Sequence, residues 1–323
     1  MIPDVTIIIP CYKVGQYLKQ GLESVLNQSH KNIQVVAIND ASPDDTAVIL
    51  NEYAARDPRL KVIHQKVNAG VSVARNIGMS EAIAPFLIFL DGDDYLPEDA
   101  VTNLLNLQRH SNADLVCANA RQCSNDGQSR CIHYNSHKGS YLLNLRQGFG
   151  SLRSHQRVFC GCIIKLFRTS LIQHHNITFD AKLRYGEDTL FTNTYIIDAH
   201  PLTVIDYDLE TYCYRQNPSS IVHAISLEKR LFNLMILIEA LDELAKKDST
   251  LRWLAAEKSA EYLWAIRKFS VNTAECQKKL RKLVQSDFFH EHIQPVLSRY
   301  GKFKHRILLK LFKHKCYWVI SLW

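Results

Sequence analysis

Three carboxylates follow a short apolar run in the first third of the chain. The run Leu87–Leu90 is apolar throughout and leads into Asp91, Gly92, Asp93 and Asp94. Like charges this close repel each other, and a cation that shares them relieves the cost. An Asp-x-Asp pair at the carboxyl end of a strand offers oxygen ligands for Mg²⁺ or Mn²⁺, which can neutralise a diphosphate. Taken alone, the residues also fit a solvated acidic turn with Gly92 at its bend.

A second acidic pair, Glu187–Asp188, follows Gly186 at the predicted start of a helix. Acidic residues are favoured there by the positive end of the helix dipole, which is one sufficient reason for the pair. A carboxylate can also accept a proton from a reacting hydroxyl, and two adjacent carboxylates raise each other's pKa. The pair is therefore a candidate for general-base chemistry.

The elements that position these residues alternate between strand and helix. Apolar runs predict strands near 5–10, 33–38, 60–64, 86–90, 114–120, 158–167 and 203–214. Amphipathic spacing predicts helices near 16–28, 72–82 and 187–198, a helix opened by Pro97, and one that is capped by Ser42 and ends near Arg56. Repeated units of this kind indicate an α/β fold with a mostly parallel central sheet. From residue 227 the pattern is purely helical, with helices predicted at 227–246, 251–268 and 274–285.

Composition narrows the functional class. The 323 residues are 46% hydrophobic and 22% charged, which is typical of a folded globular protein. No signal-peptide pattern and no run of 18 apolar residues occurs, and the nine cysteines include no Cys-x-x-Cys pair. Cys117 and Cys213 are predicted to be buried thiols, and the spacing of Cys160 and Cys162 is only weak evidence for a metal pair. We therefore expect a protein of the reducing cytoplasm.

The net charge of +7 comes entirely from the end of the sequence. Residues 299–323 contain seven Lys or Arg and no Asp or Glu, which leaves 32 basic and 32 acidic residues before them. A neutral body argues against a nucleic-acid-binding protein. On a helical projection of 302–315, Lys302, Arg306, Lys310 and Lys313 cluster on one side and apolar residues cover most of the other, with Lys304 and Leu309 as exceptions. An aromatic-rich stretch follows. The tail is therefore expected to contact an anionic membrane surface, or else to dock as a helix on the protein.

Further motifs follow the predicted strand ends and helix starts. Pro10 and Tyr12 end the first strand and can wall a flat cleft for a nucleobase, or simply pack there. Asp40 ends the second strand, and Asn68 and Arg75 lie before and within a later helix. Arg75 can offer its guanidinium to a nucleotide or diphosphate, or form a surface ion pair.

With these motifs in this order, the chain resembles bacterial glycosyltransferases of family 2, which have the nucleotide-sugar-binding GT-A fold. The resemblance covers about the first 225 residues and rests on an ordered set of segments: Thr6–Tyr12, Asn39–Asp44, Asn68–Gly70, Ala74–Gly78, Asp91–Asp94, Gly186–Asp188 and Tyr214–Arg215. The family more often has Asp-Asp-Gly-Ser where this chain has Asn39–Ser42, a departure that keeps the central Asp40.

The resemblance implies a role for each of these residues. It implies that Asp40 accepts the uracil N3–H, that Asp93 binds Mn²⁺ or Mg²⁺, and that Asp91 contacts the ribose or the metal. It also implies that Asp188 is the catalytic base, with Glu187 beside it. The segment 214–223 resembles a loop that closes over the donor, in which Arg215 can reach the diphosphate and His223 can be a further metal ligand. A surface role is the simpler explanation of a lone histidine.

These expectations predict a metal-dependent inverting glycosyltransferase that moves a sugar from a UDP-sugar to a glycan or lipid-linked acceptor for a bacterial surface polysaccharide. The expected organisation is a catalytic domain at 1–225, with the nucleotide side at 1–120 and the acceptor side at 121–225. A helical region at 226–298 and the basic tail at 299–323 follow. The expected location is the inner face of the cytoplasmic membrane, as a peripheral protein. A sugar-1-phosphate nucleotidyltransferase is the alternative enzyme, although the chain lacks the Gly-rich N-terminal loop of that class.

Overall fold

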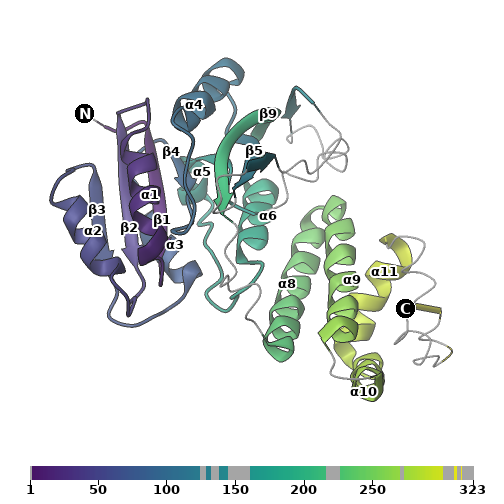
Figure 1. The fold of residues 1–323 in the computed structure, drawn as a ribbon. Coiled ribbons are helices and arrows are strands. Elements are labelled where there is room, and N and C mark those ends of the chain that lie inside the picture. The colour runs from purple at the N-terminus through teal and green to yellow at the C-terminus, as the bar shows by residue number, and fades with distance from the viewer. Residues whose placement is uncertain are drawn as a thin grey trace. The chain divides into compact units, whose positions relative to one another are not determined.

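The structure is a computed structural model that separates into two compact units, residues 1–218 and 219–323 (Figure 1). Each unit is described by itself. The residues whose structure is described are 2–123, 129–131, 138–144, 161–215, 226–269, 273–300, 309–310 and 314.

The first unit begins as an alternating α/β structure. Its strands are β1 (Val5–Cys11), β2 (Ile33–Asn39), β3 (Leu60–His64) and β4 (Phe86–Phe89), and its helices are α1 (Gly15–Leu26), α2 (Thr46–Ala54), α3 (Val71–Ser80) and α4 (Ala100–Ser111). The strands pair in parallel in the order β3-β2-β1-β4. All seven residues of β1 and all four of β4 are buried, as expected of parallel strands covered on both faces. The parallel pairing predicted for these strands is confirmed.

The rest of the sheet is mixed. β8 (Lys165–Arg168) lies antiparallel between β4 and β5 (Leu115–Cys123), and β9 (Leu202–Arg215) runs parallel to β5. β6 (Ser129–Cys131) and β7 (Ser140–Asn144) add antiparallel edges, so the described strands form one nine-stranded sheet. α5 (Thr169–His174) and α6 (Glu187–Ala199) complete this unit. The sheet is therefore parallel from β3 to β4, the strand that leads into Asp91–Asp94, and mixed beyond β4.

Alternate side chains of β1 face opposite layers. Ile7 and Ile9 join one core with α1, α2 and α4, for example through Leu22 of α1 and Leu104 of α4. Ile8 points the other way, against Gly78 of α3. Helices on both faces make three layers, with the carboxyl ends of β1, β2 and β4 at one shared edge.

An aromatic cluster holds α6 against the sheet. Phe89 of β4 contacts Phe167, Phe179 and Phe191 edge-on, and the Phe179 and Phe191 rings stack at 4.0 Å. All four are almost completely buried, and each buried phenylalanine contributes about 1.5–3 kcal/mol. Because Phe191 lies in the second turn of α6, this cluster fixes the start of the helix, where Glu187 and Asp188 lie.

Two local predictions are wrong. Ser42 does not cap α2, which begins later, at Thr46; its hydroxyl instead donates to the Cys11 carbonyl and accepts from the Lys13 amide, tying together the ends of β1 and β2. The strand predicted at 158–167 begins only at Lys165, after the described turn at 161–164. Long-range hydrogen bonds and turn geometry override local preference in both places.

The second unit is helical, as predicted. Its elements are α8 (Leu227–Lys247), η4 (Ser249–Leu251), α9 (Arg252–Phe269), α10 (Thr273–Val284), the π-helical turn η5 (Phe289–Ile293) and α11 (Gln294–Tyr300). The Ser226 hydroxyl caps α8 by accepting from the Lys229 amide, and Leu234, Leu237 and Leu241 form its buried stripe. The predicted boundary at 225 and most of the tail at 299–323 lie outside the described residues. Among the described helices, none is both long and apolar enough to cross a membrane.

Candidate functional site

Asp91–Asp94, here called the acidic loop, lies where β4 ends. The Asp94 amide donates to the Asp91 carbonyl at 3.0 Å, which closes a tight turn. The Asp91 side chain is 32% exposed, whereas Asp94 is only 2% exposed. Burial, and then the neighbouring charges of Asp91 and Asp93, raise the pKa of Asp94 to about 8. The loop therefore has an accessible side, which carries Asp91, and a buried side, which carries Asp94.

Asp40, immediately after β2, organises the segment that leads into α3. Its carboxylate accepts hydrogen bonds from the backbone amides of Ala69 at 2.7 Å and Gly70 at 2.8 Å, and from the Gln65 side chain at 2.7 Å. The Asn68 amide group donates to the Asp40 carbonyl at 3.2 Å. The structure therefore brings Asp40 and Asn68 together, as two of the predicted nucleotide-side residues. The Oδ2 atom of Asp40 carries one of these bonds and can accept another.

Pro10 and Tyr12 lie at the carboxyl end of β1, as predicted. Pro10 is buried in the strand, and Tyr12, just beyond it, is 39% exposed with the Lys13 ammonium 5.3 Å from its ring centre. An exposed aromatic ring at this edge offers a flat apolar surface on the same edge of the sheet as the acidic loop.

Arg75, on α3, joins the two acidic groups. Its side chain is 4% exposed; one terminal nitrogen donates to Asp91 at 2.7 Å and the other to Glu187 at 2.8 Å. The guanidinium also lies 5.2 Å from the centre of the Phe179 ring. Both terminal nitrogens therefore already bond carboxylates, and Arg75 acts on the acidic loop through Asp91.

Glu187 and Asp188 form the first turn of α6, which begins after Gly186 in a left-handed conformation (φ 82°). Glu187 is buried. Burial, followed by the charge of Asp188, raises the pKa of Glu187 to about 7, and the Arg75 charge opposes that rise. Asp188 is half-buried, and one of its oxygens accepts from the Thr189 amide at 2.7 Å. The two carboxylates thus differ: Glu187 is buried and paired with Arg75, whereas Asp188 is partly exposed to solvent.

The sequence interpretation missed the close approach of Gly161 and Cys162 to this acidic pair. A Cβ on Gly161 would lie 3.0 Å from an Asp188 carboxylate oxygen, and φ there is +40°, so glycine suits the position. Burial raises the pKa of the Cys162 thiol; the nearby Arg75 charge opposes that rise, and the charges of Asp188 and Asp91 add to it. Cys160 lies outside the described residues. The Cys-Gly-Cys spacing, considered only as a metal pair, was the available signal.

Arg184 is a second residue that the sequence interpretation missed. Gly70 has φ +94°, and a Cβ built there would lie 1.7 Å from an Arg184 guanidinium nitrogen. The Arg184 side chain therefore lies over the backbone of the residue whose amide binds Asp40. Its place two residues before Gly186 was the only sequence signal.

Arg215, the last residue of β9, makes two hydrogen bonds to the acidic loop. Its Nε donates to the Asp93 carbonyl at 2.9 Å, and its backbone amide donates to the Asp94 carboxylate at 2.7 Å. His223, the third predicted metal ligand, lies outside the described residues.

The oxygen donors of the acidic loop fit a hard divalent cation. Among the described residues, no group of three or more His, Cys, Asp or Glu side chains could hold a metal by itself. Mg²⁺ and similar ions are usually held by one or two protein carboxylates together with substrate phosphates, and the acidic loop offers carboxylates of that kind in Asp91 and Asp93.

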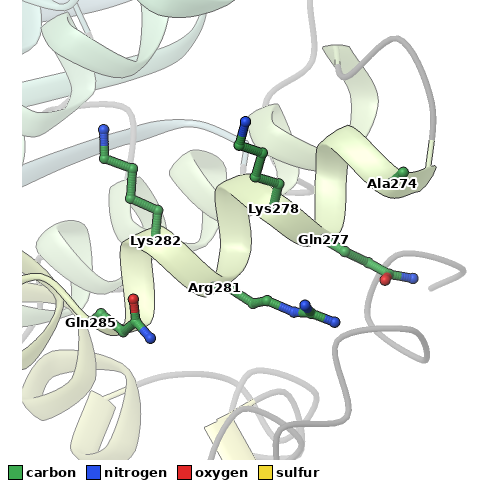
Figure 2. A pocket seen from close by; sticks show the side chains of 6 residues that line it. All are labelled: Ala274, Gln277, Lys278, Arg281, Lys282 and Gln285. Atoms are coloured by element: carbon green, nitrogen blue, oxygen red, sulfur yellow. The ribbon is translucent and has the colours of Figure 1, made fainter.

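A pocket of about 370 Å³ occurs in the second unit, along α10 (Figure 2). Apart from Ala274, its lining side chains are polar or basic: Gln277, Lys278, Arg281, Lys282 and Gln285. Lys278 and Lys282, one turn apart, extend from the same side of the helix in Figure 2. The pocket therefore offers cationic groups.

Known proteins are similar to this chain in sequence and in fold. The family model described as Glycosyl transferase family 2 matches residues 6–174. The "uncharacterized glycosyltransferase EpsJ" of Bacillus subtilis is 31% identical over 223 residues, which are 68% of this chain and 63% of that protein. The "minor teichoic acid biosynthesis protein GgaB" of the same species is 30% identical over 71% of this chain and 25% of its own length. The chain thus spans less than two thirds of these relatives.

The fold matches that of Staphylococcus aureus TarS, residues 1–349, crystallised with UDP-GlcNAc. The TM-score is 0.76 at 20% identity, over 98% of this chain and 90% of that one. The agreement confirms the predicted GT-A fold followed by a helical region.

Proposed function

Because the chain belongs to glycosyltransferase family 2, we propose that it transfers a sugar from a UDP-sugar to a hydroxyl group of a glycan or lipid-linked acceptor. The observation that carries this proposal is that Arg75 of α3 joins the acidic loop to Glu187, while Asp40, beyond the neighbouring strand β2, binds the backbone that leads into the same helix. Ligands of α/β sheets bind at this edge, beyond the carboxyl ends of the strands. The relative GgaB, which is named for minor teichoic acid biosynthesis, supports an acceptor that belongs to a bacterial surface polymer.

The donor side of the proposed site lies along β1, β2 and β4. Asp40 accepts the uracil N3–H, Tyr12 walls the base, and Asn68 holds the loop around Asp40. The TarS structures with UDP and UDP-GlcNAc support a uridine nucleotide as the donor's carrier.

Asp93 and Asp91 would hold Mn²⁺ or Mg²⁺. A bound ion supplies a Lewis acid that neutralises the charge appearing on the diphosphate as the sugar leaves it. Arg75 holds the Asp91 side chain through an ion pair, and Arg215 holds the Asp93 carbonyl through a hydrogen bond. The mannosyltransferase PcManGT of Pyrobaculum calidifontis, solved in complex with GDP-Man and Mn²⁺, is similar in fold at a TM-score of 0.53. The Mn²⁺ in that structure supports the proposal of a divalent ion here.

On the acceptor side, Asp188 takes the proton of the acceptor hydroxyl as its oxygen attacks the anomeric carbon. A single displacement of this kind inverts the anomeric centre. Gly161 leaves room for the Asp188 carboxylate, and Glu187, bound to Arg75, holds the first turn of α6. His223 remains a proposed further metal ligand.

Donor binding is the direct test. With Mn²⁺ present, a correct UDP-sugar at 100 times its Kd should raise the unfolding free energy by about 2.7 kcal/mol. For a domain of this size the melting temperature then rises by about 5–10 °C. GDP-sugars, and UDP-sugars in EDTA, should give a much smaller shift.

Turnover of the UDP-sugar in the presence of an acceptor should release UDP. Release of pyrophosphate from UTP and a sugar-1-phosphate would instead establish the alternative nucleotidyltransferase.

We also propose that the helical region attaches the enzyme to the cytoplasmic face of an anionic membrane, where a lipid-linked acceptor would lie. Residues 219–323 contain 19 Lys or Arg and 10 Asp or Glu. The cations include the exposed Lys278, Arg281 and Lys282 of α10, as well as those of the tail. Each basic residue close to an anionic leaflet contributes about 1 kcal/mol.

Two double variants test the membrane proposal. Lys278→Glu with Lys282→Glu, and Arg306→Glu with Lys310→Glu, should each weaken co-sedimentation with phosphatidylglycerol vesicles about 30-fold or more, because two attractions are lost. Lys246→Glu with Lys247→Glu makes the same charge change on α8 and should have little effect. If wild-type protein ignored these vesicles at low salt, or if all three variants behaved alike, the membrane proposal would be wrong.

A further inference from the structure

We infer that Tyr212, Asp94 and Arg215, here called the latch, are positioning residues that hold the acidic loop in the shape that binds the metal–diphosphate group. The inference deepens the proposed function and rests on it. The three residues are contributed by the acidic loop and the end of β9, which are more than 110 positions apart in the sequence.

The Tyr212 hydroxyl connects the two ends of the acidic loop. It accepts a hydrogen bond from the Asp91 amide at 3.2 Å and donates one to the Asp94 carboxylate at 2.6 Å. Tyr212 and Asp94 are almost fully buried, so water cannot replace these bonds. One phenol therefore fixes the backbone of the first carboxylate and the side chain of the last.

Arg215 holds the middle of the loop. Its backbone amide donates to the second Asp94 oxygen at 2.7 Å, and its Nε donates to the Asp93 carbonyl at 2.9 Å. The guanidinium lies 5.0 Å from the ring centre of Tyr17 and 5.3 Å from that of Tyr95, and it also bonds the Gln20 side chain. These three contacts fix the position of the Arg215 side chain. With the Asp93 carbonyl directed toward β9, the orientation of this peptide is set by Arg215.

A buried carboxylate next to two others is a costly way to build a turn. The Asp94 side chain is almost fully out of contact with water, although two further carboxylates belong to the same short loop. An apolar residue would make a cheaper anchor for stability alone. Unlike an apolar residue, Asp94 also fixes the orientation of the loop relative to β9, because its two oxygens accept hydrogen bonds from two separate donors of that strand. Groups that orient metal-binding carboxylates in this way typically change metal affinity 10- to 100-fold when they are removed.

Tyr212→Phe tests the latch, because it removes one hydroxyl and leaves the ring in place. With UDP saturating, Mn²⁺ affinity measured by titration calorimetry should fall about 10- to 100-fold. UDP affinity in EDTA should stay unchanged. Asp94→Asn should shift Mn²⁺ affinity in the same direction.

Tyr195→Phe is the matched control. The Tyr195 hydroxyl is also buried and also makes two bonds, to the Asp114 carbonyl and from the Arg168 amide. Both phenylalanine variants should lower the melting temperature by similar amounts, but only Tyr212→Phe should weaken Mn²⁺ binding. Equal Mn²⁺ affinity in the two variants would overturn the latch and leave the proposed function standing. A wild-type protein that binds UDP no better with Mn²⁺ than with EDTA would overturn both.

Discussion

Asp93→Asn is expected to lower sugar transfer by about three orders of magnitude. The neutral amide is a poorer ligand for a hard cation than a carboxylate, and the Lewis-acid contribution at stake is several kcal/mol. About 4 kcal/mol corresponds to a factor of roughly 10³ in rate. The same change should weaken UDP binding in Mn²⁺ but not in EDTA, which calorimetry with and without the metal would measure.

Asp99→Asn is the control for this prediction. Asp99 is exposed, lies at the start of α4, and loses the same charge without touching the acidic loop. Its activity should remain within about twofold of wild type, as is usual for surface changes. Wild-type activity that persists in full in EDTA would show that Asp91 and Asp93 serve another purpose.

Asp188→Asn is expected to lower kcat by about 10²- to 10⁴-fold, the usual contribution of a general base. The affinity for the UDP-sugar should change little, because Asp188 acts on the acceptor and because Arg75 binds Glu187 and not Asp188. Single-turnover rates and donor Kd, measured on the same preparation, separate the two effects. Product analysis on the wild type should show an inverted anomeric centre.

Asp198→Asn provides the matched change at the other end of α6, away from the acidic pair. It should retain normal kcat. If Asp188→Asn weakened donor binding and kept kcat, Asp188 would belong to the donor side. Retention of the anomeric configuration would exclude single displacement, and with it the role of Asp188 as the base for that step.

Much of the fold is determined by local patterns in the sequence. Buried parallel strands are mostly apolar along their length, so β1, β2 and β4 were predictable from the local pattern of apolar residues. The change from apolar Leu87–Leu90 to three carboxylates predicted a strand end with an acidic loop, because charged groups cannot remain inside the sheet. The long helices after residue 226 followed from amphipathic spacing in the same way.

The partners of the polar side chains were decided only by the tertiary structure. Arg75 was expected either to face a nucleotide or to form a surface ion pair. It is buried, and its guanidinium pairs with Asp91 and with Glu187, the latter 112 positions away in the sequence. The Tyr212–Asp94 bond spans 118 positions, and β8 inserts antiparallel between β4 and β5. Polarity and spacing determine which residues form a strand, a turn or a helix, because those depend on near neighbours. Which donor meets which buried acceptor depends on how the layers pack, and local sequence carries no record of that.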